Sequence, residues 1–421
     1  MQLFRASDTG AARSSLPHTI DPLRVAFVLK DLQLSGGVGV VVEHASRLRA
    51  DHGIDAQLVL SEPETHPRWA YPRLDEIPVL TLDDARQQRW DVGVATWWET
   101  ATVLFHLECE RYAFFIQALE DSLARPSEPE RVTAPLATAL PVRFITEAHW
   151  IAEMLASLQP GNPALVVRNG IDKGVFEPVA EPAAPSADEP LRVLVEGSPS
   201  TPLKGVAQTF EALALMREDA HVTWVAPHGA AEVPAGVDRV LERQTHSQMA
   251  ALYAESHVLV KLSRAEGMYG PPLEGFHKGC TVVTTAVTGH EEYVRHMENG
   301  LVVGWDDVHG TARALDLLAK DRQLLATLRT GAVETARAWP DWDASAAEFA
   351  DALRSVAAEP PPPVSASGVR LAAEIATVTA ELQRRDRDLE SAHKALENFK
   401  AERAWVLATK VRGAYHRVRR R

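Results

Sequence analysis

The chain has 421 residues, 46% of them hydrophobic and 24% charged, which is the composition of an ordinary soluble protein with length for two domains and an appendage. Its formal net charge of −13 argues against a general nucleic-acid-binding protein. Cys109 and Cys280 lie in apolar segments without metal-ligand spacing, which indicates two buried thiols, a reducing cytosol and no metal site.

Residues 1–20 lack the apolar centre of a signal peptide, and no apolar run approaches the length of a membrane-spanning helix. We therefore expect a disordered leader over these residues and an intracellular protein. The apolar run Leu23–Leu29 predicts the first strand.

The first domain, expected over 21–176, continues from this strand into a glycine loop and a helix. Gly36, Gly37 and Gly39 precede apolar residues at helical spacing. Glycine lets backbone N–H groups close on a phosphate, but tight turns also use glycine, and the order is not the G-x-G-x-x-G dinucleotide fingerprint. Further strands are predicted at Ala56–Leu60, Asp91–Thr96, Tyr112–Ile116, Val142–Thr146 and Ala164–Val167.

Adjacent tryptophans follow the strand predicted at 91–96. Trp97 and Trp98 either stack on sugar rings in a cleft or cap the core, and the residues by themselves favour neither. At the end of the domain, Asn169-Gly170 is a strong turn signal. The Pro-, Ala- and acid-rich stretch 177–190 follows and predicts an interdomain linker.

The second domain, expected over 191–340, begins with the strand Leu191–Glu196 and a loop that ends in Lys204-Gly205. A lysine before a helix start can meet a phosphate as a point charge, whereas the alternative is a solvated surface lysine. Strands are also predicted at Val222–Ala226 and Arg239–Leu241, with a helix at Ser247–Ser256.

The stretch 257–303 predicts a strand–loop–helix–strand unit of parallel α/β type. Its loop contains Glu266, and Glu274 lies in the first turn of the helix that follows. Loops at the carboxyl ends of parallel strands line the ligand crevice, and the next helix points its positive end there. An anionic, hydroxyl-bearing ligand suits both features, since amides hold phosphate and carboxylates accept bonds from sugar hydroxyls.

Within this stretch, SRAEG-x₃-PPLEGF-x₂-G-x-x-VVTT-x₃-G-x-x-E-x-V-x₄-NGLVV resembles the donor-binding segment of retaining glycosyltransferase family 4, which has the GT-B fold. Glu266 and Glu274 match the family's E-x₇-E spacing. The resemblance implies that Glu274 holds the donor ribose and that Glu266 lies by the transferred sugar as the main catalytic residue. Gly267, Gly289 and Glu292 belong to the same motif and are expected to bind the donor.

Other loops resemble this family less completely. The glycine loop around Gly37 and Gly39 is similar to the family's first loop, which faces the donor diphosphate. Lys204 matches the lysine of G-R-x₄-K-G, but the arginine is absent, so Arg264 is the candidate for the second cation.

The catalytic position in the first domain also departs from the family. Many members carry a histidine where this chain has Gln117, so Gln117 and Glu120 are the candidate substitutes. ATWW-E-T followed by FFIQ-x-x-E resembles a subgroup that includes rhamnosyltransferases of bacterial surface glycans, which favours deoxythymidine diphosphate rhamnose as donor.

Residues 341–421 follow the second domain. The resemblance implies that a terminal helix at 341–358 crosses back to the first domain, before a Pro-rich linker at 359–368. Over 369–421, apolar residues at alternating spacings of four and three predict a coiled coil, or else a long helix folded onto the body. Residues 400–421 hold eight Lys/Arg and one Glu, a charge of +7, which suits an anionic membrane surface or a solvated basic tail.

Together these features predict an α/β protein with two Rossmann-like domains facing a GT-B cleft, plus a C-terminal helical or coiled-coil extension. We expect it to move a sugar from a nucleoside diphosphate sugar, with retention, to a glycan or lipid-linked acceptor in cell-envelope polysaccharide synthesis. No cofactor, metal or nucleic acid is expected. Possible partners of the extension are the inner face of the membrane and a second coiled-coil chain. The alternatives are a non-catalytic GT-B scaffold and a nucleotide-sugar epimerase.

Overall fold

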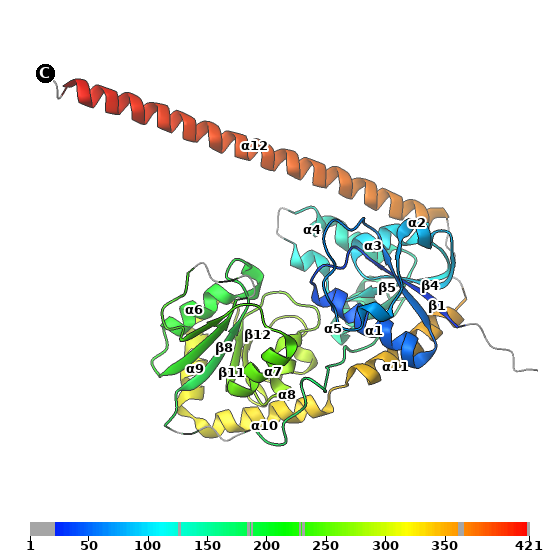
Figure 1. Cartoon of the computed structure of the whole chain (residues 1–421), viewed down its shortest axis with the longest axis horizontal. Coiled ribbons are helices and arrows are strands. Elements are labelled where there is room, and N and C mark those ends of the chain that lie inside the picture. Colours follow the sequence, from blue (N-terminus) through cyan, green and yellow to red (C-terminus); the bar gives the residue numbers. More distant parts are fainter. Residues whose placement is uncertain are drawn as a thin grey trace, which may run out of the picture.

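The computed structural model describes residues 22–124, 128–182, 186, 188–226, 229, 232–360 and 366–418; in the last helix it describes side chains at 368–401 and 403. The predicted leader 1–20 lies outside the described residues, as do most side chains of the predicted basic tail. Two α/β domains lie side by side, and one long helix, α12, projects from the first of them (Figure 1).

The first domain is built on a parallel sheet of order β3-β2-β1-β4-β5-β6-β7. Its strands are β1 (Arg24–Leu29), β2 (Asp55–Leu60), β3 (Val79–Thr81), β4 (Arg89–Ala95), β5 (Glu108–Ile116), β6 (Arg143–Thr146) and β7 (Leu165–Val166). The sequence pattern did not predict β3, and β5 begins four residues before the predicted Tyr112 because its polar first residues pair with the exposed start of β4.

Both faces of this sheet are buried. Successive side chains of a strand point to opposite faces, so Val25 and Phe27 enter one apolar layer while Ala26 and Val28 enter the other. Burial on both faces explains why the strands appear in the sequence as continuous apolar runs and not as alternating ones.

The second domain repeats this design with the order β10-β9-β8-β11-β12-β13, again all parallel. Its strands are β8 (Leu191–Glu196), β9 (Ala220–Val225), β10 (Arg239–Leu241), β11 (Val258–Lys261), β12 (Thr281–Thr285) and β13 (Gly300–Val303). The direction of winding reverses between β8 and β11, and ligands bind at such a switch point, outside the carboxyl ends of the strands.

Helices cover the faces of both sheets (Figure 1). They are α1 (Gly36–His52), α2 (Leu82–Ala85), α3 (Trp98–Val103), α4 (Glu130–Thr133), α5 (His149–Leu158), α6 (Val206–Ala214), α7 (His246–Glu255), α8 (Gly270–His277), α9 (Val308–Lys320), α10 (Arg322–Ala338), α11 (Trp342–Ala358) and α12 (Ala366–Val418). Short 3₁₀ helices include η3 (Glu120–Leu123), η4 (Ala134–Ala139), η5 (Pro202–Lys204) and η6 (His290–Glu292).

The chain returns to its first domain after completing the second. Helix α11 packs in the apolar layer of β1 and β5, where the rings of Phe349 and Phe115 lie 5.0 Å apart. The outgoing and returning segments touch, because Ile171 forms a bridge with Asp341 and a Cβ at Gly170 would meet the Asp341 backbone at 2.4 Å. This close approach requires a glycine at the domain junction.

Helix α12 has two parts with different surroundings. Ala372, Ile375 and Thr379 are buried against the first domain, and Gln383 donates to Glu130 of α4 at 3.1 Å. Farther along, Leu389 is 68% exposed and Phe399 51%, and the helix stands clear of the body (Figure 1). The start of α12 is therefore a folded part of the domain, while the coiled coil stays a prediction for the projecting part.

Among the described residues, no helix is both long and apolar enough to cross a membrane.

Candidate active site

The candidate site lies at the carboxyl ends of β8, β11 and β12, where the second domain meets the first. The Lys204 ammonium reaches the Glu266 carboxylate here, at 2.8 and 2.9 Å from its two oxygens. The Glu266 side chain is 14% exposed and that of Lys204 is 36% exposed, so the pair is partly shielded from water. The structure thus brings together two residues that the sequence predicted separately for the donor site.

Local backbone geometry places Lys204. Helix η5 ends at Gly205, which adopts φ +63°, and a Cβ there would lie 2.0 Å from the Leu262 carbonyl oxygen. Only glycine permits both this conformation and this contact. The loop after β8 is consequently pressed against the end of β11, which brings Lys204 to Glu266.

A second set of charges lies behind this pair. The buried Lys261 ammonium is 3.1 Å from a Glu196 carboxylate oxygen. Burial opposes the charge on Lys261, but the carboxylates of Glu196 and Glu266 outweigh it and raise the lysine's pKa. Burial, and then the charge of Glu196, raises the pKa of Glu274 to about 8, although Lys261 opposes this shift. Glu274 is therefore mostly protonated at pH 7 and can donate as well as accept a hydrogen bond.

On the other side of the cleft, the glycine loop lies against Gln117. The Gln117 amide nitrogen is 3.3 Å from the Gly37 carbonyl oxygen, and a Cβ at Gly37 would lie 3.2 Å from the Gln117 side-chain oxygen. Gly39 lies two residues farther along α1, near the Tyr71 ring. The two predicted first-domain elements are thus neighbours at the amino end of α1, where free backbone N–H groups favour an anion.

Two first-domain candidates lie in the core and not in the cleft. Trp98 is 1% exposed within the apolar layer of α3 and β5, so its ring offers no face to a sugar, which corrects the stacking prediction for this residue. Trp97 is partly buried against the same layer. Glu120 is 8% exposed, and burial raises its pKa well above the usual value despite a backbone hydrogen bond from Trp98. A carboxyl so enclosed is poorly placed to take a proton from a substrate, which favours a packing role for Glu120.

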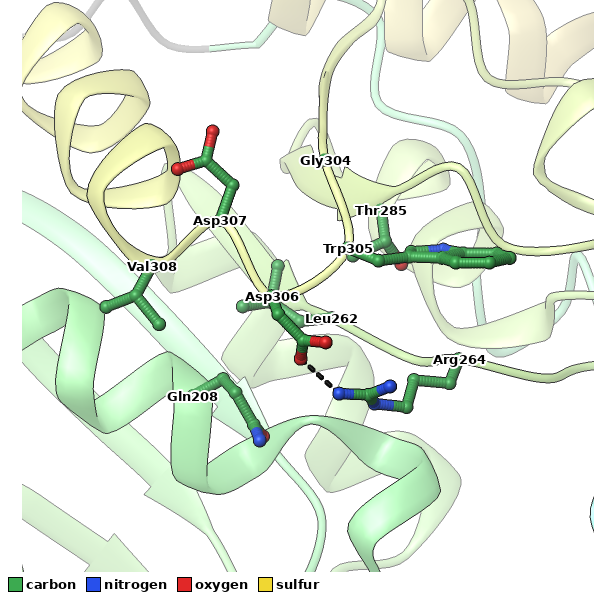
Figure 2. Close-up of a pocket in the computed structure, with 9 residues that line it drawn as sticks. All are labelled: Gln208, Leu262, Arg264, Thr285, Gly304, Trp305, Asp306, Asp307 and Val308. Carbon is green, nitrogen blue, oxygen red and sulfur yellow. Dashed lines mark hydrogen bonds and ion pairs between the residues drawn. The ribbon is translucent and has the colours of Figure 1, made fainter.

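Arg264 has an acidic partner of its own, other than Glu266. Its guanidinium pairs with Asp306 in a shallow hollow lined by residues of α6 and the start of α9. Figure 2 shows this pair, with the indole of Trp305, which is 57% exposed, over the same hollow. To act as the second diphosphate cation, Arg264 would have to leave Asp306.

The remaining donor-loop candidates contact the first domain. A Cβ at Gly267 would lie 1.8 Å from the Gln117 carbonyl oxygen, and one at Gly289 would lie 2.2 Å from the Gly267 carbonyl oxygen. Glu292 accepts hydrogen bonds from the backbone N–H groups of His149 and Trp150 at 2.7 and 3.2 Å. These three residues are therefore placed at the domain interface.

Sequence reasoning missed several residues of the site, among them Glu196, Lys261, Glu147 and Trp150. Lys261 is hidden within an apolar run, and Glu196 is the last residue of a strand. Glu147 and Trp150 do follow the end of β6, and this position at the carboxyl edge of a parallel sheet is the one signal that could have drawn attention to them. In the described part of the chain, no three His, Cys, Asp or Glu side chains gather as metal ligands, and independence from metal stays a prediction.

Comparison with known proteins agrees with this arrangement. Residues 190–321, which span the whole sheet of the second domain, match the family model described as glycosyl transferases group 1. No curated protein sequence matches the chain.

Several solved structures are similar to the whole body. A sucrose-phosphate synthase from Thermosynechococcus elongatus has a TM-score of 0.65 at 16% identity, covering 79% of this chain and 98% of its own. Anabaena HepE in complex with UDP and glucose has a TM-score of 0.62 at 18% identity, covering 79% and 100%.

WaaG, a glycosyltransferase involved in lipopolysaccharide biosynthesis, has a TM-score of 0.60 at 16% identity, covering 78% of this chain and 99% of its own. The chain has the GT-B fold. At these identities the likeness shows the fold alone, while the family match supports a group 1 glycosyltransferase domain over 190–321.

Proposed function

We propose that the protein is a glycosyltransferase that moves a sugar from a nucleoside diphosphate sugar to a hydroxyl acceptor. The observation that carries the proposal is the ion pair of Lys204 and Glu266 at the switch point of the second sheet, with Glu274 behind it. A cation at that place can meet the donor diphosphate, and a carboxylate can bind the hydroxyls of the sugar.

Departure of the diphosphate places negative charge on phosphate oxygens and leaves a sugar with oxocarbenium character. Lys204 can stabilise the first charge, together with the backbone N–H groups that open α1 near Gly37. When a phosphate draws Lys204 away, the Glu266 carboxylate is freed for the sugar, where it holds hydroxyls and steadies the positive face. Glu274, which can donate and accept, suits the two hydroxyls of a ribose.

The finer proposals concern stereochemistry and substrates. The E-x₇-E spacing supports a retaining enzyme of family 4, and the segments around Trp97 and Gln117 favour a deoxythymidine diphosphate rhamnose donor and a rhamnosyltransferase-like role. A similar structure named above holds UDP and glucose, and another belongs to a protein of lipopolysaccharide biosynthesis. Both support a nucleotide-sugar donor and a glycan or lipid-linked acceptor of the cell envelope.

A thermal-shift panel with UDP, GDP, ADP and dTDP tests the donor. A ligand at 100 times its dissociation constant adds roughly 2.7 kcal/mol to the free energy of unfolding, which is readily measured. We expect one diphosphate to stabilise the wild type and to lose its effect in Glu274→Ala. If no diphosphate stabilises the wild type, the non-catalytic scaffold becomes the better proposal, and consumption of a nucleotide sugar without acceptor would indicate an epimerase.

The projecting part of α12 is proposed to attach the enzyme to the inner face of an anionic membrane or to a second copy of itself. The +7 charge of 400–421 supports the membrane role. Deletion of 384–421 keeps the buried start of the helix, so we expect unchanged transfer to a soluble acceptor but weaker binding to anionic vesicles. Unchanged binding to vesicles would exclude the membrane role, and sedimentation of both forms tests self-association.

A further inference from the structure

Four consecutive residues of the first domain, 147–150, carry one group of hydrogen bonds to the second domain. They follow β6 and open α5. Through side chains and backbone, this segment makes hydrogen bonds to Gly267, Met268 and Glu292 of the second domain. Gly267 and Met268 directly follow Glu266, the proposed catalytic carboxylate.

A first-domain carboxylate holds the donor loop. Glu147, which is 4% exposed, accepts the Met268 backbone N–H at 2.7 Å, and its other oxygen accepts from the Asn169 side chain at 2.7 Å. The indole N–H of Trp150 donates to the Gly267 carbonyl oxygen at 3.2 Å. The Gly267 carbonyl and the Met268 N–H are therefore bonded to the opposite domain.

A second-domain carboxylate makes the reciprocal contact. Helix α5 begins after Ala148, which has no side-chain oxygen with which to cap the helix. The Glu292 carboxylate, which is 5% exposed, accepts the first two N–H groups of the helix, from His149 and Trp150, and lies 2.9 Å from the His149 ring nitrogen. Glu292 thus caps a helix of the other domain, at the end where a negative charge is favourable.

Backbone atoms of the two domains are in close contact at Gly267. Gly267 lies between the Gln117 carbonyl oxygen and Gly289, and a Cβ at Gly267 would come within 1.8 Å of that oxygen. The domains can approach this closely only with glycine at 267. Since consecutive Cα atoms are 3.8 Å apart, the position of Gly267 also limits that of Glu266.

We propose that Glu147 and Glu292 are positioning residues. Together with the rest of segment 147–150, they clamp the two domains together and hold the Glu266 loop against Gln117. The proposed function enters only in the claim that Glu266 acts on the transferred sugar. The clamp assembles the site from both domains, because Glu266 and Lys204 come from one and Gln117 and Gly37 from the other. Catalytic rates depend steeply on such placement, and a misplacement of about 1 Å can cost 100-fold.

The substitution Gly267→Ala tests the clamp without removing any polar group. Its methyl group would meet the Gln117 backbone, so we expect the domains to separate, with a larger radius of gyration in X-ray scattering and faster hydrogen exchange at the Met268 and His149 amides. Gly270→Ala is the matched control, because a Cβ at Gly270 meets nothing within 4 Å. An unchanged radius of gyration and unchanged amide protection in Gly267→Ala would overturn the proposal.

Two further variants separate positioning from folding. Glu292→Ala removes the helix cap and should open the domains, whereas Glu292→Gln keeps an acceptor oxygen for the His149 N–H and should restore much of the closure. Stabilisation by a nucleoside diphosphate should persist in both, because Lys204 and Glu274 are untouched. With an active wild type, we expect kcat to fall about 100-fold in Gly267→Ala and Glu292→Ala. If Gly267→Ala and Glu292→Ala both keep the wild-type kcat and the wild-type domain closure, the residues of the clamp do not position the Glu266 loop.

The scattering and exchange measurements require no transfer activity. They therefore test the clamp even if the wild type proves inactive. In that case the proposed function fails, but the clamp proposal does not. Closed domains in Glu292→Ala, with a protected Met268 amide, would reject the role of Glu292.

Discussion

The two sides of the cleft carry their ionisable groups in different ways. On the second-domain side, Lys204 pairs with Glu266 and Lys261 with Glu196. On the first-domain side, Gln117 is uncharged, and burial raises the pKa of Glu147 to about 7 and that of Glu120 well above its usual value.

This difference matches the different tasks that we propose for the two sides of the cleft. Neutralising a diphosphate requires charge, and a charged pair that a ligand can rearrange provides it. Holding a hydroxyl acceptor and closing against another domain favour groups that bury without leaving an unpaired charge. Substitutions on the charged side should accordingly reduce turnover most, and those on the other side should mainly change stability and its pH dependence.

Glu266→Gln is expected to have the largest effect. It keeps the shape of the side chain but removes the negative charge that we propose acts on the sugar, so transfer should be nearly abolished while the fold remains. Steady-state transfer and circular dichroism measure the two quantities. Glu211→Gln, at an exposed position on α6, is the control. Near-wild-type turnover in Glu266→Gln would show that the site is wrongly assigned.

Lys204→Ala should have the second-largest effect. We expect a loss in kcat on the order of 100-fold, because one electrostatic donor to the leaving diphosphate is removed. It also leaves the Glu266 carboxylate without its partner, so Lys204→Arg should recover part of the activity. Lys320→Ala changes an exposed lysine of the same domain and should have no effect. If Lys204→Ala weakens neither diphosphate binding nor turnover, the lysine is a surface residue.

The third prediction concerns pH and Glu147. Its pKa is raised from 4.5 to about 7 by burial, which outweighs the hydrogen bonds from Asn169 and Met268. The folded protein therefore holds this proton more tightly than the unfolded chain, so the contribution of Glu147 to stability is present below about pH 4.5 and is lost as the pH rises to 7.

Glu147→Gln is neutral at every pH and should remove this dependence. The Asn169 side-chain oxygen, which has no hydrogen-bond partner among the described residues, can accept from the new amide. We expect the variant to gain on the order of 1–3 kcal/mol relative to wild type between pH 5 and pH 7. Denaturant unfolding across this range measures the difference, and a constant difference would mean that Glu147 does not titrate there.

Glu120→Gln should have the smallest effect. Glu120 is enclosed, and burial raises its pKa well above the usual value, so the amide replaces a carboxyl of similar shape whose charge burial disfavours. We expect transfer within about threefold of wild type and a stability change near 1 kcal/mol or less. A loss of transfer comparable to that of Glu266→Gln would restore Glu120 as a catalytic residue.

Much of the molecule follows from the sequence alone. Apolar runs, glycine loops and turn residues predicted two parallel α/β domains, because strand burial and turn chemistry are local properties of a few neighbouring residues. The resemblance of the Glu266–Glu274 stretch to a family's donor-binding segment, and the position of Lys204 before a helix, predicted a donor site in the second domain. The apolar repeat over 369–421 predicted a coiled coil or else a long helix folded onto the body.

Only the tertiary structure decided which of these groups meet. Trp98 turned into the core, Arg264 paired with Asp306, and the start of α12 became part of the first domain. Glu292, expected at the donor, caps a helix 143 residues earlier in the chain. Such pairings depend on how two separately folded sheets come together, and no local pattern encodes the contact of residues so far apart.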